Sequence, residues 1–531
     1  MRQIVLFSLL YAVLPVFAQP AGKVQVEMSA PFENDRKRTY VTDMFRNDAG
    51  DIYLVKSEDK ITIGEALVGA MAKNDPTVLI EKYDASLKQV YSTPLFSEAM
   101  GDKKVYYQGV YVLNKKPWFF SAYFDSEQDM RILYRHDLKE NGRLGDPVKV
   151  AEMESGKGGG RFNIIFSQDS QLLAVVARPA VKGKKPEELT FHVFDRDFQL
   201  VREGSTTFPY INKEMDVKGL TLTNQGDFSA LVSWEKDKNR DGKQFVEEIF
   251  IFPNGENEPR RIPLDLGEHY VLDFFVLPDK AGNLYGVGPY NLISKRQKFK
   301  DGVPPTSLGT AWIRIDHATW QAGKPVLNLY KTETKTFMES KSKLVYGYGF
   351  QYFRNFKAWV TDDARVFLDM EQDWRTETQG NALHSVHNQS EMILLVQFDA
   401  SGKVAQEVIV PHKVSGGGIV QGLFHIALRK GDTFYFIYND NAKNFRKVFK
   451  TVKDIDGVVA PGSSGIPLKS NKPHVVLCTV APDGSKTFDS VFDFKEVEVF
   501  LHTPDVLMAD SNTLVVVGSY GRDFRLFRLK L

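Results

Sequence analysis

One hairpin pattern recurs along the whole chain and constrains the fold more than any other feature. Residues 391–411, EMILLVQFDASGKVAQEVIVP, hold an apolar run rich in β-formers, a short turn that opens at Asp399, and a second β-rich run. This order is typical of a β-hairpin. Looser copies begin at residues 77, 130, 189, 248, 309 and 474. Seven copies of one supersecondary unit indicate a repeat protein.

A second hairpin precedes each of these copies, so that every repeat holds four strands, A to D. The first of these preceding hairpins starts at Tyr40 and turns between Asp48 and Asp51. An eighth repeat begins at Asp505 and supplies three strands, while residues 24–31, VQVEMSAP, otherwise lack a partner. We therefore expect the N-terminal strand to complete the last repeat and to close the ring.

A closed ring of four-stranded sheets resembles a β-propeller. The resemblance covers residues 19–531 and is to the architecture, because the repeated Trp-Asp, Gly-His and paired-Gly signatures of named propeller families are missing from the sequence. We predict an all-β fold of eight blades, with seven as the alternative if two weak repeats merge. The predicted blades lie near residues 37–98, 105–154, 161–208, 215–266, 269–331, 350–412, 419–494 and 505–531 with 24–31.

The first 18 residues predict a secretory signal peptide, since Arg2 precedes an apolar run that ends in Ala18. The run is short and contains Pro15, and no other stretch is long and apolar enough to span a membrane. We expect an exported protein, periplasmic or extracellular. The lone Cys478 lies in the apolar run VVLCTV and is predicted to be a buried small hydrophobic residue.

Charge and strand order together indicate where a partner would bind. Removing Arg2 from the 68 basic residues leaves 67, which equals the 67 acidic ones. Bulk charge therefore gives no reason to expect a nucleic-acid partner.

In an up-and-down blade the A–B and C–D turns share one face, and here these turns are short. We call this the plain face. The B–C loops and D–A crossings share the opposite face and hold nearly all insertions, and we call this the elaborated face. Elaborated loops on a rigid scaffold are where binding usually occurs.

One insertion has the spacing of a calcium loop. In the blade 4 segment DKNRDGKQFVEE, the pattern predicts a structural Ca²⁺ site, with Gly242 at the sharp turn and the Lys243 carbonyl as one ligand. The predicted metal ligands are Asp237, Asn239, Asp241, Lys243 and Glu248. The alternative is a solvated polar hairpin loop, because no helices flank the segment and Lys236, Lys238 and Arg240 bring positive charge.

Candidate binding residues lie in the insertions of blades 5 and 6 and in the crossing between them. Four basic residues could form a positive rim, and three aromatic residues suit a sugar ring or a protein partner. They are Lys295, Arg296, Lys298 and Lys300, together with Tyr346, Tyr348 and Trp374. The competing interpretations are solvated charges and aromatic padding between blades.

Two function classes remain open from the sequence. The first is a binding or scaffolding propeller that presents its elaborated face to a protein or a glycan. The second is a hydrolase or lyase that acts on glycans at the central channel. We favour binding, because no catalytic motif stands out and because a propeller fold does not by itself imply chemistry. Catalytic residues are not predicted.

Overall fold

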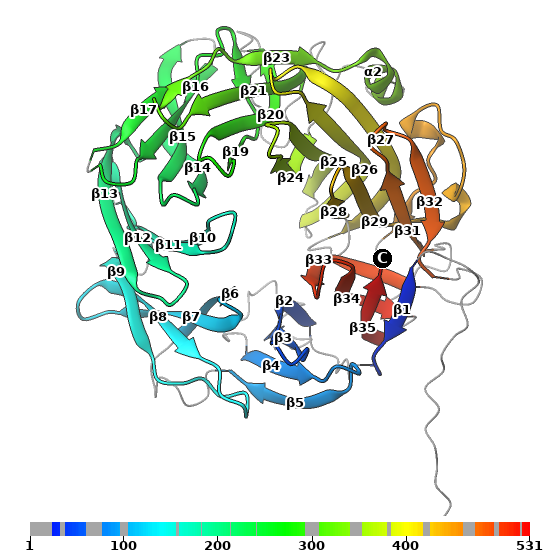
Figure 1. Ribbon diagram of the computed structural model, residues 1–531, viewed down its shortest axis with the longest axis horizontal. Coiled ribbons are helices and arrows are strands. Elements are labelled where there is room, and N and C mark those ends of the chain that lie inside the picture. Colours follow the sequence, from blue (N-terminus) through cyan, green and yellow to red (C-terminus); the bar gives the residue numbers. More distant parts are fainter. Residues whose placement is uncertain are drawn as a thin grey trace, which may run out of the picture.

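The computed structural model of the chain is a closed ring of β-sheets around a central axis (Figure 1). It describes the following residues: 24–31, 38–59, 77–95, 105–155, 159–181, 183–212, 214–239, 242–256, 258–292, 307–339, 353–379, 384–417, 425–459, 473–492, 499–520 and 523–531. Residues 63–73, for which the capping-box spacing of Thr62 and Glu65 predicts a helix, lie outside them. Within the described part of the chain, no helix is long and apolar enough to cross a membrane.

The first four blades each consist of four consecutive antiparallel strands. They are β2 (Arg38–Arg46), β3 (Ile52–Asp59), β4 (Thr77–Tyr83) and β5 (Gln89–Pro94); β6 (Val105–Leu113), β7 (Lys116–Asp125), β8 (Met130–Asp137) and β9 (Val148–Glu154); β10 (Arg161–Phe166), β11 (Leu172–Arg178), β12 (Pro186–Asp195) and β13 (Leu200–Ile211); and β14 (Met215–Leu222), β15 (Phe228–Asn239), β16 (Gly242–Phe252) and β17 (Arg260–Pro263).

Blades 5 to 8 keep this order with local additions. In blade 5 the first and last strands are each split in two. Blade 5 holds β18 (His269–Val271), β19 (Phe275–Pro278), β20 (Leu284–Leu292), β21 (Gly309–Asp316), β22 (Gln321–Ala322) and β23 (Val326–Leu329), and helix α2 (Thr332–Glu339) follows it. Blade 6 holds β24 (Phe353–Val360), β25 (Val366–Gln379), β26 (His384–Phe398) and β27 (Val404–Gly417). Blade 7 holds β28 (Ile426–Lys430), β29 (Thr433–Asn441), β31 (Pro473–Val480) and β32 (Lys486–Ser490), with η1 (Ala442–Asn444), η2 (Val452–Asp454) and β30 (Val458–Val459) in its insertion, and blade 8 holds β33 (Val499–Met508), β34 (Thr513–Tyr520) and β35 (Asp523–Lys530).

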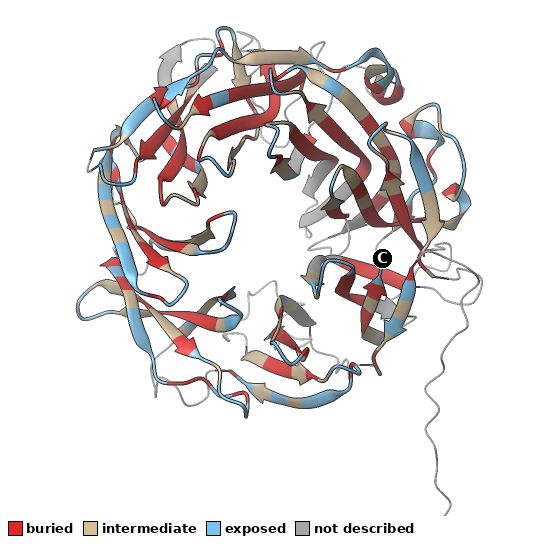
Figure 2. Ribbon diagram, viewed as in Figure 1, coloured by how far each residue is buried: buried red, intermediate tan, exposed pale blue. Residues whose placement is uncertain are grey.

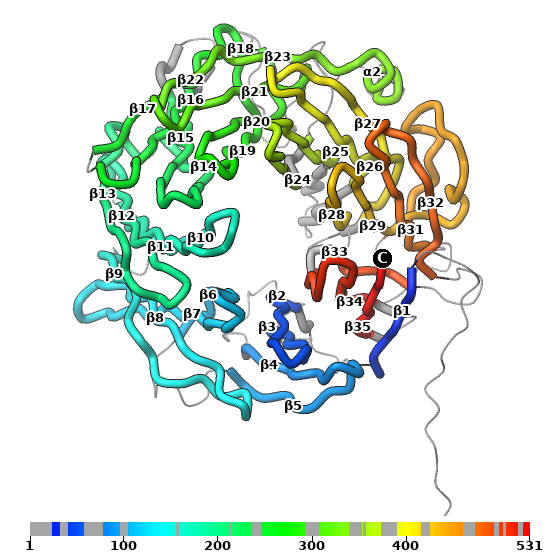
Figure 3. Tube along the Cα trace, in the orientation of Figure 1, coloured from blue at the N-terminus to red at the C-terminus, as the bar shows by residue number. Residues whose placement is uncertain are grey.

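The ring closes through the N-terminal strand, as the sequence predicts. Strand β1 (Gln25–Met28) pairs with β35 in antiparallel register, from Gln25 opposite Lys530 to Met28 opposite Phe527. The last sheet therefore has the order β1-β35-β34-β33. Figure 3 shows this N-terminal strand in blue beside the C-terminal strands in red. The eight-bladed β-propeller is confirmed, and the seven-bladed alternative is wrong.

Eight hydrophobic clusters form among the described residues, and each joins two neighbouring blades. Strand β26 shows how one strand serves two clusters. Its residues Ile393 and Leu395 pack toward blade 7, and Leu394 and Val396 pack toward blade 5. Side chains alternate between the two faces of a strand, so a sheet covered on both faces needs an uninterrupted apolar run. Figure 2 shows these inner stretches of the blades as buried, and Cys478 is among the buried residues.

The A–B turns of neighbouring blades are tied together on the plain face. Lys280 of blade 5 accepts a hydrogen bond at its carbonyl from Gln225 of blade 4, and its ammonium pairs with Asp362 of blade 6 at 2.8 Å. Further contacts of this kind are Lys115–Asp48, Asp169–Asn224, Arg365–Asp432, Lys430–Asn512 and Arg46–Ala509. These turns therefore satisfy much of their polar surface within the ring.

The insertions of blades 4 and 6 differ from the loops that the sequence analysis expects. In both, the flanking strands continue as paired hairpins, to Asn239 opposite Gly242 and to Gln379 opposite His384. The insertion of blade 7 folds back through η1 and η2, and its strand β30 adds in parallel to β27 of blade 6. Continued backbone pairing satisfies the amide groups that a long loop would leave to water.

Removing the N-terminal strand tests ring closure. Deleting residues 19–35 should lower the free energy of unfolding by roughly 3 kcal/mol or more, because full burial of one aliphatic side chain is worth about 1.5–3 kcal/mol and Val24, Val26 and Met28 all contact the blade 7–8 cluster. Thermal and urea unfolding measure the change. Gln25→Ala, at an exposed position of the same strand, is the control and should change stability by less than about 0.5 kcal/mol. A deletion variant that unfolds like the intact chain would rule out closure through β1.

Candidate functional site

A group of charged side chains is buried where blades 6 and 7 meet. Asp369 and Glu371 lie on β25, and His425 directly precedes β28. The imidazole of His425 contacts both carboxylates, with Nδ1 at 2.8 Å from Glu371 Oε2 and Nε2 at 2.7 Å from Asp369 Oδ2. All three side chains are at most 1% exposed. One histidine thus bridges two acids across the blade junction.

The second oxygen of Glu371 joins two more strands to the group. Glu371 Oε1 lies 3.0 Å from His412 Nε2, on β27, and accepts a hydrogen bond from the hydroxyl of Ser390, on β26. Ser390 Oγ also lies 2.8 Å from His412 Nε2. We call Asp369, Glu371, Ser390, His412 and His425 the junction cluster. It connects three strands of blade 6 to the first strand of blade 7.

The local strand pattern explains how these residues come to one side. Asp369 and Glu371 are two apart and therefore share a face of β25, the face that Phe367 presents to blade 7. Their neighbours Leu368 and Met370 pack on the opposite face in the cluster toward blade 5. Register shifts follow Glu371 in the β25–β26 pair and Ser390 in the β26–β27 pair. Such bulges re-aim side chains next to them.

The pKa values follow from burial and from the close partners. Burial lowers the pKa of His425, but Asp369 and Glu371 outweigh burial and raise it to about 10. Burial raises the pKa of Glu371, yet His425 and His412 bring it down to about 2. Burial raises the pKa of Asp369 and exceeds the opposing effect of His425. At neutral pH His425 is therefore an imidazolium that donates both N–H groups to acids.

The geometry limits what the junction cluster can do chemically. In a serine hydrolase triad the serine and the acid contact opposite nitrogens of the histidine. Here Ser390 and Glu371 both contact Nε2 of His412, while His412 Nδ1 and Asp369 Oδ1 have no hydrogen-bond partner among the described residues. No group of three or more His, Cys, Asp or Glu residues in the described ranges is arranged for a metal ion. The cluster is an ionic tie between blades and is closed to solvent.

No residue of the junction cluster is among the candidates that the sequence indicates. A usable signal was present, because Asp369 and Glu371 interrupt the apolar strand VFLDME, and His412 and His425 stand in VIVPHKV and LFHIAL. Charged residues are seldom fully buried unless they are paired. Their appearance at inward positions of three apolar strands could therefore have indicated a buried network.

The predicted binding residues are not brought into a common site by the described structure. Lys295, Arg296, Lys298, Lys300, Tyr346 and Tyr348 lie outside the described residues. Trp374 lies in β25, where its backbone pairs with Gln389 of β26. Their role in binding stays a prediction.

The predicted calcium ligands lie along one hairpin. Asp237 pairs with Gln244, Asn239 with Gly242, and Lys243 with Lys238; Asp241 lies outside the described residues. Glu248 is further along β16, opposite Val232. Its carboxylate accepts hydrogen bonds from Tyr210 Oη at 2.6 Å and from Arg261 Nη2 at 2.8 Å. Both bonds end on Oε2 of Glu248, so a bond to Ca²⁺ would use Oε1 or displace these partners.

No known family model matches the chain, and no curated protein matches its sequence. Among solved structures, the polysaccharide lyase Uly1 superposes with a TM-score of 0.40 at 9% identity, over 75% of this chain and 86% of that one. An ACO/RPE65 chimera gives 0.37 at 11% identity, over 95% and 94%. A protein of unknown function from Dyadobacter fermentans gives 0.33 at 9% identity, over 96% and 99%. Similarity this low bears on neither the activity nor the ligand of this protein.

The junction cluster predicts how stability depends on pH. The pKa of His425 is raised from 6.5 to about 10. The contribution of protonated His425 to the free energy of unfolding is therefore complete below pH 6.5 and is lost as pH rises toward 10. The pKa of Glu371 falls from 4.5 to about 2, so its contribution is lost as pH falls from 4.5 toward 2. Urea unfolding across this range should show a loss of a few kcal/mol on the alkaline side.

A histidine substitution isolates the alkaline effect. His425→Gln should destabilise the protein at pH 6 and flatten the decline above pH 6.5. His136→Gln is the matched control. Burial lowers the pKa of His136, so the stability that its neutral ring contributes is lost as pH falls and not as pH rises. An alkaline decline that survives unchanged in His425→Gln would contradict the assignment.

Calcium binding has a separate test. If the blade 4 hairpin holds Ca²⁺, adding it to chelator-treated protein should raise the melting temperature in a saturable way. Asp237→Ala combined with Asp241→Ala should abolish the rise, whereas Asp265→Ala, an acid outside the hairpin, should keep it. The absence of any thermal response at millimolar Ca²⁺ would refute the prediction.

Proposed function

We propose that this protein is an exported binding or scaffolding propeller that presents its elaborated face to a protein or glycan partner. The observation that carries the proposal is the projecting sheet of blade 6. Among the described residues, β24 pairs with β25 as far as Phe353 opposite Gln372, while β25 and β26 stay paired to Gln379 opposite His384. The seven further residues of β25 extend about 23 Å at about 3.3 Å per residue.

The projecting sheet is braced near its base. Strand β27 stays paired with β26 up to Gly417 opposite His387, and β30 from the blade 7 insertion pairs with β27 at Val414 and Ser415. A site on paired strands is held more precisely than a site on a loop. A hairpin of this kind offers backbone and side chains to a partner at little cost in conformational entropy.

The plain face is a weaker candidate for the main partner. Its A–B turns already bond to one another around the ring, as with Lys280 and Asp362. Trp374 lies on the projecting hairpin, and aromatic anchors are common at the centres of protein interfaces. These points favour recognition by the elaborated face.

A glycan hydrolase or lyase is the second candidate. It is favoured by the junction cluster, because perturbed pKa values of acids and histidines often mark active sites. Burial argues against it, since Glu371 and His425 are closed to solvent. The two functions separate in one assay, in which a lyase or hydrolase shortens the polysaccharide and a binding protein leaves it intact.

Binding assays on variants of the elaborated face test the proposal. Against a panel of neutral and uronate-containing polysaccharides, Trp374→Ala should weaken binding by at least tenfold, about 1.4 kcal/mol. Combined Ala substitution of Lys295, Arg296, Lys298 and Lys300 should weaken binding to acidic members of the panel. Ser401→Ala, in a plain-face turn, should bind like the parent protein. If Ser401→Ala lost binding and the other two variants kept it, the assignment of the face would be wrong.

A further inference from the structure

The insertion of blade 7 carries a dense run of positive charge on the outer side of the ring. Residues 442–453, AKNFRKVFKTVK, hold five basic residues and no acidic one, although the whole chain has 68 basic and 67 acidic residues. All five basic residues are exposed. Figure 1 shows this insertion, in orange, outside strand β27. We give the name basic tip to Lys443, Arg446, Lys447, Lys450 and Lys453.

Little of this charge is compensated within the ring. The ammonium of Lys447 lies 4.0 Å from the carboxylate of Asp456, which is the outer limit of an ion pair. In the described part of the chain, the other four cations form no ion pair. The next acid along the sequence, Asp454, accepts hydrogen bonds from the backbone N–H and the hydroxyl of Thr451. The repulsion among the uncompensated cations would be relieved by a negatively charged partner.

A valine stands among these cations with its side chain in water. Val448 is 96% exposed, the highest value for any large hydrophobic residue that the structure describes. Other apolar residues of the insertion pack inward, Phe445 against the blade 6–7 cluster and Phe449, Val452 and Ile455 against the blade 5–6 cluster. Val448 therefore projects from the surface, at a position from which it can enter an apolar phase.

The insertion that carries the basic tip is fixed to the ring at its base. The buried Asn444 donates hydrogen bonds from Nδ2 to Asp440 Oδ1 and to the Asp456 carbonyl, both at 2.7 Å, and accepts one from the Asp456 N–H at 3.0 Å. The amide of Asn441 donates to the Gly457 carbonyl at 2.8 Å, and strand β30 pairs with β27. The tip is thus held in place before a partner arrives, which lowers the conformational entropy cost of binding.

We infer that the basic tip docks the propeller on an anionic lipid membrane, with its cations at the headgroups and Val448 at the edge of the acyl region. A bilayer surface offers negative headgroups beside an apolar interior. Each Lys or Arg near such a surface strengthens binding about fivefold. Five cations and one apolar side chain therefore suffice for reversible, peripheral attachment. This docking does not depend on the function proposed above.

The composition of the basic tip favours a membrane over other anionic partners. Four of its five cations are lysines, and lysine is depleted at protein–protein interfaces, where arginine is enriched. A lysine ammonium is a point charge on a flexible stem, which suits mobile headgroups. An acidic polysaccharide or a nucleic acid would compensate the cations but would leave Val448 in water.

Vesicle binding tests the inference on the intact protein. The protein should bind in a saturable way to vesicles in which about one third of the lipid is phosphatidylglycerol, and at least about tenfold more weakly to vesicles of phosphatidylcholine alone. Raising the salt concentration from about 0.1 M to about 0.5 M should weaken the binding, because salt screens the headgroup charge. Cosedimentation with the vesicles measures both effects.

A charge-matched pair of variants locates the surface. Combined Arg446→Gln, Lys447→Gln and Lys450→Gln should weaken binding to the anionic vesicles by at least about tenfold, with an unchanged melting temperature. The control removes the same charge from three exposed lysines in plain-face turns and should bind like the parent protein. Its substitutions are Lys139→Gln, Lys324→Gln and Lys403→Gln.

A fluorescent label separates insertion into lipid from attraction by charge. Val448→Cys provides one reactive thiol, because the native Cys478 is buried and its burial raises the pKa of the thiol to about 12. A nitrobenzoxadiazole group on this thiol should brighten and shift to the blue on anionic vesicles, whereas the same group on Lys139→Cys should not. Val448→Ser should weaken vesicle binding about threefold or more and leave its salt dependence unchanged.

Three results would overturn the inference. The first is equal binding, or no binding, to the anionic and the neutral vesicles. The second is unchanged binding in the triple variant of the basic tip. The third is a label at position 448 that keeps its spectrum on bound vesicles while dextran sulfate displaces the protein from them, which would show that the tip recognises an acidic polymer by charge alone.

Discussion

The pairing of β1 with β35 is the constraint on which the rest of the ring depends. Each blade buries both of its faces against neighbours, and the eight hydrophobic clusters lie between blades. A ring left open would expose the apolar faces of two blades to water. Four residue pairs, from Gln25 to Met28, hold the first segment of the chain to the last. Local sheets thereby become one cooperative structure, because no blade can lose its neighbour without exposing apolar surface.

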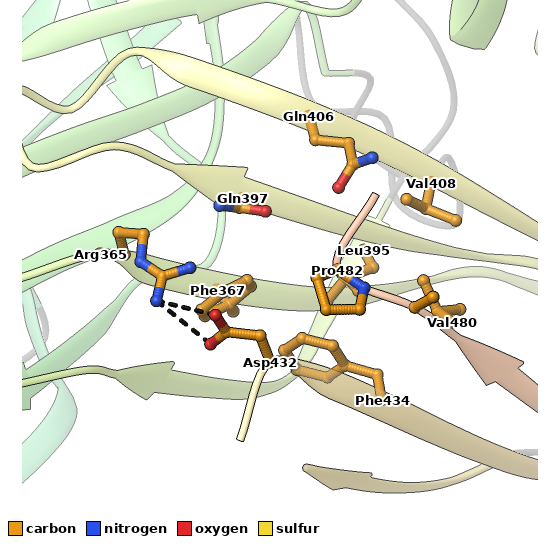
Figure 4. A pocket seen from close by; sticks show the side chains of 11 residues that line it. Arg365, Phe367, Leu395, Gln397, Gln406, Val408, Asp432, Phe434, Val480 and Pro482 are labelled. Atoms are coloured by element: carbon orange, nitrogen blue, oxygen red, sulfur yellow. Dashed lines mark hydrogen bonds and ion pairs between the residues drawn. The ribbon is translucent and has the colours of Figure 1, made fainter. Parts of the chain in front are cut away.

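The junction of blades 6 and 7 departs from this apolar scheme at both ends. Toward the elaborated face it holds an imidazolium between Asp369 and Glu371. Buried ions lose much hydration free energy, and only close, oppositely charged partners offset that loss. Toward the plain face, a shallow groove lies between the two blades, and its rim carries the ion pair of Arg365 and Asp432 (Figure 4). One junction therefore combines a buried ionic tie with a shallow groove lined by Phe367 and Phe434.

Much of the fold could be predicted from the sequence because its signals are local. The apolar runs and their Asp-Gly turns, such as Asp399 to Gly402, are defined by neighbouring residues. Repetition of this pattern fixes the strand order, and the unpaired strand at residues 24–31 indicates the closure. The hairpin continuations to Gln379 and Gly242 were missed, because polar residues in a paired strand look like a loop when the cross-strand partner is unknown.

The sequence by itself determined the repeat, the number of blades, the closure and the face that carries the insertions, because strand period and turn chemistry act over a few residues. Only the tertiary structure decided which side chains meet. His425 contacts Asp369 across 56 positions of sequence, and Gly484 meets Gln406 across the blade boundary. Such contacts depend on the register and the bulges of several strands at once. A shift by one residue would turn Glu371 to the opposite face of its strand, and no local pattern specifies that outcome.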